Sequence, residues 1–257
     1  MNDHTFIAHC PNTGSMDTCL KKDSDILLSY SNNKNRKLPF TLEMIKPEES
    51  WIYVNTIEVN RIIEYFLVNQ NDLLKDITKE YSFLKREPKL FEHKFDFLLF
   101  NEKHKNQLQN INLKNSVYLK NHRTKDQAPL LIEIKNVTYY NNKLDCLQFP
   151  DAITKRGYKH IQLLSKLQKM GYRTMVFFVL SREEGKFFMP AYHIDPEFSK
   201  ILKNYYINKG TILPIRFKYI INKISNKSFI KDFPNLVDEL EFYEVNIFLN
   251  SIETIQW

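Results

Sequence analysis

The chain has 257 residues, of which 43% are hydrophobic and 26% charged, with only 5 glycines and 10 prolines. This composition is typical of folded globular domains and excludes a low-complexity chain. Lysine and arginine number 37 against 30 acidic residues, and the net charge of +7 favours a polyanionic partner, although many basic proteins bind none.

Strands and turns are predicted for the first 50 residues. The extended candidates are 5–8, 25–30 and 40–45, and the stretch 11–14 has the composition of a turn. A short extended stretch, 52–54, then leads into a helix that Asn55 or Thr56 could cap and that continues through Leu67. Residues 71–92 are polar, and we expect a loop there with a short strand near 81–85.

Three apolar runs between residues 94 and 180 are predicted to be the core strands. The apolar run 94–100 has Asp96 inside it, and a second run, 129–138, alternates apolar residues with Glu133 and Lys135. The fully apolar stretch 174–180 predicts a strand that is buried on both faces.

A helix is predicted between the second and third of these strands, from about residue 154 to 170. Ile161, Leu164 and Leu167 recur at helical spacing, and Gly171 provides its end. The resulting order of elements predicts an α/β core with at least one parallel crossover.

Two segments stand apart from this core. Residues 101–128 carry six lysines or arginines against two acids, which predicts a long basic loop. A further strand is expected over 212–221, and the remaining residues have no clear pattern.

Three patterns that the sequence lacks lead to an expectation about the cellular compartment. Cys10, Cys19 and Cys146 match neither a disulfide framework nor a paired metal motif, so we expect buried, reduced thiols. The first twenty residues lack the pattern of a signal peptide, and no run approaches the roughly 18 apolar residues of a spanning helix. We therefore expect a cytoplasmic protein with no membrane partner.

Asp96, Glu133 and Lys135 are the candidate catalytic residues. An unpaired carboxylate within an apolar strand is costly, and a shared cation would relieve that cost. Glu133 and Lys135 are two residues apart and so point to the same face of one strand, where an acid could hold Mg²⁺ or Mn²⁺ and the ammonium could orient water. The alternative is a Glu133–Lys135 ion pair at a solvated edge, with Asp96 ending a strand. Glu64 could add a third oxygen, or it could be a surface residue.

An ordered set of short motifs resembles the sugar fermentation stimulation protein (SfsA) family over roughly residues 5–220. The motifs are His-Cys-Pro-Asn-Thr-Gly-Ser-Met at 9–16, Val-Asn-Thr at 54–56 with Asn60, Asp-Phe-Leu-Leu at 96–99, Glu-Ile-Lys-Asn-Val-Thr at 133–138, Phe-Pro-Asp-Ala at 149–152, Thr-Lys-Arg-Gly at 154–157, Lys-His at 159–160 and Ile-Asp-Pro at 194–196.

The resemblance implies an N-terminal OB-like β-barrel domain followed by a PD-(D/E)xK nuclease-like α/β (α+β) core. It implies that Asp96 and Glu133 are metal carboxylates, that Lys135 is the catalytic lysine and that Glu64 is a helix acid. It also implies binding to DNA without strong sequence preference and a link to the regulation of sugar (maltose) use.

The sequence departs from the family pattern in ways that shape the domain prediction. Only eight residues precede the His-Cys-Pro-Asn motif, so we expect an incomplete OB-like domain over 1–50. The nuclease-like domain is expected over 51–220 with the basic insertion 101–128, and 221–257 is a C-terminal extension. The family's Ser-Arg before the strand aspartate is His93-Lys94 here, which keeps a charge but loses a bidentate phosphate fork.

Five basic residues are candidate nucleic-acid contacts. Arg156, Lys159 and His160 share one side of a predicted helix start, where free N–H groups also favour phosphate; a solvated helix start with Arg156 paired to Asp151 is the alternative. Lys94 and Arg123 complete the set.

Three functions remain open at this point. The first is a regulatory, non-specific DNA-binding protein, and the second is an active Mg²⁺- or Mn²⁺-dependent nuclease. The third is an interaction scaffold in which Asp96 and Glu133 form structural ion pairs.

Overall fold

The computed structural model describes residues 5–69, 71–119, 127–224 and 242–257. Within these ranges the core is a seven-stranded mixed sheet. Its strands, in spatial order, are β16 (Phe242–Ile252), β15 (Thr211–Ile224), β13 (Arg173–Leu180), β10 (Leu130–Val137), β8 (Phe97–Phe100), β5 (Phe83–Arg86) and β9 (Val117–Tyr118). Strands β10, β13 and β15 are parallel, as the predicted crossover requires, and the outer pairs are antiparallel.

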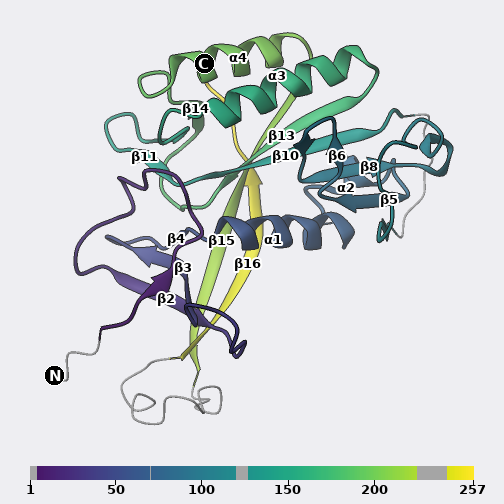
Figure 1. Ribbon diagram of the computed structural model, residues 1–257. Coiled ribbons are helices and arrows are strands. Elements are labelled where there is room, and N and C mark those ends of the chain that lie inside the picture. The colour runs from purple at the N-terminus through teal and green to yellow at the C-terminus, as the bar shows by residue number, and fades with distance from the viewer. Residues whose placement is uncertain (1–4, 70, 120–126, 225–241) are drawn as a thin grey trace.

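Helices cover both faces of this sheet (Figure 1). Helix α1 (Thr56–Val68) packs on one face, and its Asn55 cap accepts hydrogen bonds from the backbone N–H groups of Ile57 and Glu58. Helices α3 (Lys155–Lys169) and α4 (Pro196–Ile207) pack on the other. Because alternate strand residues face opposite sides, Leu130 and Ile132 pack with α1, whereas Leu131 packs with α3 and α4. The short helix α2 (Lys75–Thr78) follows α1.

The N-terminal residues form a separate small sheet. It joins β1 (Ala8–His9), β3 (Phe40–Lys46), β2 (Asp25–Tyr30) and β4 (Ile52–Tyr53). The strands at 25–30 and 40–46 are those that alternation predicted, whereas the first strand is shorter and lies later than the predicted 5–8.

The C-terminal hairpin reaches from the core to this small sheet. In Figure 1, β15 and β16 run past α1 toward β2 and β3. The rings of Tyr53 and Tyr219 stack with centroids 6.1 Å apart, and Val245 and Ile247 pack against the same hydrophobic cluster as Met44. Residues beyond 220 therefore contribute to the packing of the N-terminal sheet.

The segment predicted as a basic loop is largely packed against the core. It begins with a 3-10 turn, η1 (Glu102–His104), and contains β9, which pairs with β5. Leu108, Ile111 and Leu119 are buried. Most of the described part, 101–119, consists of turns between β8 and β10, as expected for the loop predicted over 101–128, but buried apolar side chains anchor it to the core. Residues 120–126 lie outside the described ranges.

The remaining strands form two further small sheets. One is the hairpin β6 (Lys89–Leu90) and β7 (His93–Lys94), and the other joins β11 (Tyr139–Asn141), β12 (Cys146–Phe149) and β14 (Phe188–Pro190). All three cysteines are free thiols; Cys19 and Cys146 are buried as predicted, but Cys10 is exposed. No helix in the described part of the chain is long and apolar enough to cross a membrane.

Candidate metal centre and cleft

Asp96 and Glu133 meet because of the register between two strands. Strands β8 and β10 are antiparallel and pair Phe97 with Ile132. Continuing this register by one position puts Asp96 opposite Glu133. Glu133 points to the face of the sheet that α3 covers, where it contacts His160, whereas the Asp96 carboxylate reaches Asn60 on α1. The apolar run predicted over 94–100 is therefore divided: β7 ends at Lys94, β8 begins at Phe97, and Asp96 lies just before the strand.

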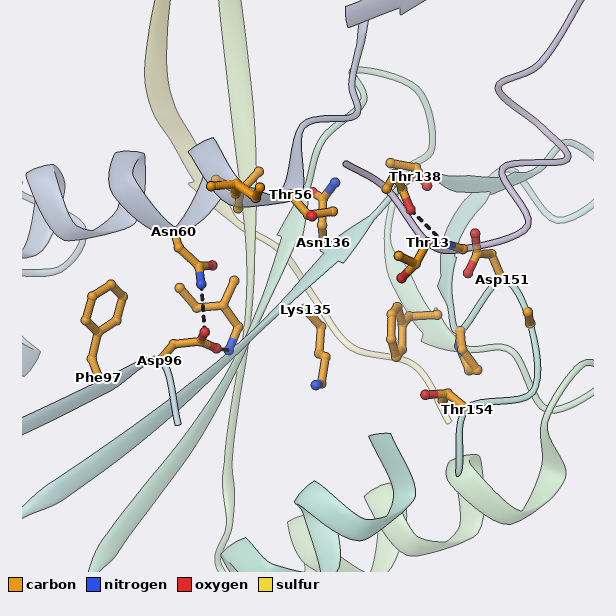
Figure 2. Close-up of a pocket in the computed structure, with 18 of the residues that line it drawn as sticks. Thr13, Thr56, Asn60, Asp96, Phe97, Lys135, Asn136, Thr138, Asp151 and Thr154 are labelled. Carbon is orange, nitrogen blue, oxygen red and sulfur yellow. Dashed lines mark hydrogen bonds between the residues drawn. The ribbon is translucent and has the colours of Figure 1, made fainter. Parts of the chain in front are cut away.

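The Asp96 carboxylate is held by two donors. Its Oδ2 accepts a hydrogen bond from the backbone N–H of Ile134 at 2.6 Å, and its Oδ1 accepts one from the Asn60 amide at 2.6 Å. Figure 2 shows the Asp96 carboxylate between these donors, with Lys135 nearby on β10. Asp96 thus fills the place where the β8–β10 ladder ends, because its side chain satisfies a backbone N–H that has lost its strand partner.

The electrostatics of Asp96 are unusual for an aspartate. Burial, followed by the nearby charge of Glu133, raises the pKa of Asp96 to about 7, against the opposing effects of the Ile134 N–H, Lys135 and Asn60. Two facing carboxylates that repel each other in a partly buried position are a favourable environment for a cation.

Glu133 is buried, with 4% of its surface exposed. Its Oε1 lies 2.5 Å from Lys135 Nζ and 2.5 Å from His160 Nδ1. Burial alone would raise the pKa of Glu133, but Lys135 and His160 outweigh it, so the net shift is downward and the group is ionised. The predicted ion pair with Lys135 is therefore present, but it lies in the interior rather than at a solvated edge.

An open pocket of ≈ 480 Å³ lies in front of this centre. Its walls come from six parts of the chain: the turn 12–14, the start of α1, residues 86–87, residues 96–97, the stretch 134–138 and the loop 149–154. Asp96 and Lys135 line it, and so does Arg86. Figure 2 shows Lys135 and Asn136 on the strand between Asp96 on one side and Thr13, Asp151 and Thr154 on the other.

The turn and the loop in this wall are locked together. Asp151 Oδ2 accepts a hydrogen bond from the backbone N–H of Met16 at 3.1 Å, and Ser15 donates to the Asp151 carbonyl at 2.7 Å. A Cβ on Gly14 would come within 2.2 Å of the Asp151 carboxylate, so only glycine allows this approach. Asp151 lies in a bend before α3, and the cap of this helix is Thr154, whose side chain accepts a hydrogen bond from the backbone N–H of Gly157.

The site offers a divalent cation only part of its ligands. Asp96 and Glu133 offer carboxylate oxygens, which Mg²⁺ and Mn²⁺ prefer, and Mg²⁺ is commonly held by one or two carboxylates with water and substrate phosphate completing its shell. Among the described residues, no group of three or more His, Cys, Asp or Glu side chains is arranged to hold a metal ion. Water and phosphate would therefore have to supply most of the ligands.

The helix acid predicted at Glu64 is one turn away from the contact that α1 makes with the centre. Glu64 forms an ion pair with Arg86 at 3.2 Å, while Asn60, one turn earlier, donates to Asp96. Asn60 and Arg86 were not predicted as site residues. Nothing in the spacing distinguished Asn60 from Glu64, since both lie on the same face of the helix.

The predicted nucleic-acid contacts fall into different environments. Arg156 and Lys159 are exposed on α3, and Lys94 is exposed and pairs with Glu87 at 3.5 Å. His160 is only 4% exposed and faces Glu133, so a direct phosphate contact by this side chain does not fit the structure. Arg123 lies outside the described residues.

Comparison with known proteins identifies two matching families of domain. A model described as the sugar fermentation stimulation protein RE domain matches residues 58–223, and one described as the SfsA N-terminal OB domain matches residues 1–54. The sugar fermentation stimulation protein homolog of Geotalea uraniireducens (strain Rf4) is 33% identical over 210 residues, covering 81% of this chain and 78% of that protein. The homolog from Acidithiobacillus ferrooxidans (strain ATCC 53993 / BNL-5-31) is 30% identical over 218 residues, covering 84% and 82%.

A solved structure shares the fold. The structure of Pyrococcus furiosus SfsA in complex with Ca²⁺ has a TM-score of 0.72 and 16% sequence identity, covering 100% of this chain and 88% of that chain. At this identity the likeness shows the fold alone. Together with the family matches it confirms the predicted class, an OB domain followed by a nuclease-like core.

Proposed function

Because the chain belongs to the sugar fermentation stimulation protein family, we propose that it is a cytoplasmic DNA-binding protein of low sequence preference with a nuclease-type metal centre in its cleft. The observation that carries the proposal is the proximity of Asp96, Glu133 and Lys135 at the end of the β8–β10 ladder, beside a pocket. Centres of this kind act on nucleic-acid phosphodiesters. A role in regulating sugar (maltose) use belongs to the proposal and rests on the family resemblance alone.

The roles of the residues follow from their positions. Asp96 and Glu133 would hold Mg²⁺ or Mn²⁺, and a related protein was solved in complex with Ca²⁺. Such an ion would polarise a phosphoryl oxygen as a Lewis acid. Lys135 Nζ lines the pocket and would donate to a phosphate oxygen or orient water, Asn60 holds Asp96 in place, and Glu64 acts through Arg86.

Duplex binding tests this proposal directly. We expect a duplex of about 30 base pairs of arbitrary sequence to bind in Ca²⁺ with an affinity that falls steeply as salt rises, because lysine and arginine displace condensed counterions from phosphates. Fluorescence anisotropy at several salt concentrations measures the slope. Two unrelated duplex sequences should bind within about threefold of each other, since phosphate contacts carry no sequence information. Absent binding, or binding insensitive to salt, would refute the proposal.

An active nuclease is the second candidate, and a specific observation favours it. All three residue types needed for metal-assisted hydrolysis are retained. Asp96 and Lys135 line the pocket, and Glu133 is buried behind it, with its Oε1 2.5 Å from Lys135 Nζ.

Divalent-ion affinity should depend on pH through Asp96. The pKa of its carboxyl is raised to about 7 by burial and by Glu133, so below that pH an incoming cation must displace a proton. We expect the Mn²⁺ affinity to rise about tenfold per pH unit up to about 7 and then to level off. Calorimetry between about pH 5.5 and 8.5, in buffers of different ionisation enthalpy, counts the released protons. A flat profile across this range would contradict the assignment.

A further inference from the structure

Helix α3 carries an unusual concentration of positive charge. Its exposed residues include Lys155, Arg156, Lys159, Lys166 and Lys169, and no acidic residue occurs between Lys155 and Lys169. The opposite face of the same helix is apolar and packs into the core through Ile161, Leu164 and Leu167. The positive charge is therefore confined to the solvent-facing side.

Four of the lysines form a single line along the helix. At about 100° per residue, Lys155, Lys159, Lys166 and Lys169 project within an arc of about 80°, and Arg156 lies to one side. The exposed Gln162 lies in the middle of this arc. We call Lys155, Lys159, Lys166 and Lys169 the lysine stripe.

The stripe lacks the ion pairs that several lysines at the other helices form. Lys75 and Lys79 on α2 and Lys200 on α4 each pair with an acid three residues earlier. Within the described ranges, no stripe lysine contacts a carboxylate; Lys166 lies over the ring of Phe91, 5.2 Å from its centroid. Lysines that are merely solvating a helix are expected to be interspersed with acids, as they are on α2 and α4.

The spacing within the stripe matches a duplex groove. At about 1.5 Å per residue, the inner lysines Lys159 and Lys166 are about 10.5 Å apart along the axis, and each has a second lysine about 4.5–6 Å beyond it. That gap is close to the roughly 12 Å width of the major groove and wider than the roughly 6 Å minor groove.

We propose that the lysine stripe docks duplex DNA, with Lys155 and Lys159 on one backbone and Lys166 and Lys169 on the other side of the major groove. The inference rests on the proposed DNA-binding function and names a contact surface for it outside the cleft. Thr154, the cap of α3, lines the pocket, and His160 on the buried side of α3 contacts Glu133. The N-terminal end of the stripe, at Lys155, is therefore next to a residue that lines the pocket.

The test compares two variants with the same change in net charge. The stripe variant replaces the four stripe lysines with glutamine. The control variant replaces four ion-paired surface lysines with glutamine, namely Lys75, Lys79, Lys186 and Lys200. We expect the stripe variant to reduce the magnitude of the slope of log affinity against log salt, for a duplex of about 30 base pairs, by about 3.6, since each of the four phosphate contacts contributes about 0.9. The control variant should lower it by less than about one. Thermal unfolding checks that both variants fold.

The outcomes separate the two proposals. If the wild type binds duplex DNA and the two variants behave alike, the docking role of the stripe is wrong while the proposed function stands. If the wild type does not bind, the proposed function itself fails. A single strand of the same length supplies a last comparison: equal slope losses on single-stranded and duplex DNA would overturn the groove-spanning arrangement.

Discussion

Replacing Glu133 with glutamine should lower the affinity for Mn²⁺ by at least about 100-fold and reduce any Mn²⁺-dependent cleavage of DNA to background. The amide has the shape of the carboxylate but no charge, so one of two anionic ligands is lost. The change also leaves the Lys135 ammonium, which lies 2.5 Å from Glu133 Oε1, without its compensating charge. That uncompensated cation would repel a divalent ion, so the loss should exceed that of a single neutral ligand.

Calorimetry with Mn²⁺ and the nicking of supercoiled plasmid measure the two effects. The matched control is Glu197→Gln, which removes an exposed acid on α4 that pairs with Lys200. This control should leave both measurements within about twofold of wild type, as expected for a surface pair. Equal products from wild type and Glu133→Gln would exclude the nuclease proposal. Equal Mn²⁺ binding heats would exclude Glu133 as a metal ligand and favour a structural ion pair.

Replacing Arg216 with methionine should destabilise the fold by about 3–5 kcal/mol, the range for breaking a buried charged network. Arg216 is 7% exposed on β15, and its guanidinium donates to the backbone carbonyls of residues 182–185. Its Nε also donates to Glu253 at 2.8 Å. Methionine fills a similar volume but leaves these acceptors unsatisfied inside the protein, and that desolvation accounts for most of the expected cost.

Urea unfolding of the wild type and variants gives the free energies. Arg216→Lys keeps the charge but cannot reproduce the planar set of donors, so it should recover less than about half of the loss. Lys218→Met, at an exposed position on the same strand, should change stability by less than about 0.5 kcal/mol. A loss below about 1 kcal/mol for Arg216→Met would show that water satisfies the loop carbonyls without the guanidinium.

Local patterns in the sequence were sufficient for the central elements. Three apolar residues at helical spacing and a following glycine predicted α3, and its observed bounds, Lys155–Lys169, agree closely with the predicted 154–170. The fully apolar run at 174–180 predicted β13, which is buried along that stretch. In both cases residues close in sequence are enough to predict which side chains are buried, because the side-chain period of a helix or strand is a local property.

Pairings between distant segments depended on the tertiary structure. The sequence alone identified Asp96, Glu133 and Lys135 as candidates, but only the β8–β10 register brings Asp96 opposite Glu133. Which α1 side chain reaches Asp96 depends on where the helix lies along its axis relative to the end of β8, and that position selects Asn60 rather than Glu64. Packing likewise turns His160 inward, although the preceding Lys159 is exposed.

The contact between the two ends of the chain was not expected from the sequence. The first 50 residues and the tail beyond 220 were predicted as an incomplete domain and an extension without a clear pattern. In the structure, hairpin strands β15 and β16 extend beyond the core sheet and pack near the N-terminal sheet, through contacts such as Tyr53 with Tyr219. The sequence determined the residue types of the centre and the order of its strands. The tertiary structure decided which of them meet, because long-range contacts depend on register and helix position, and neither is encoded in local periodicity.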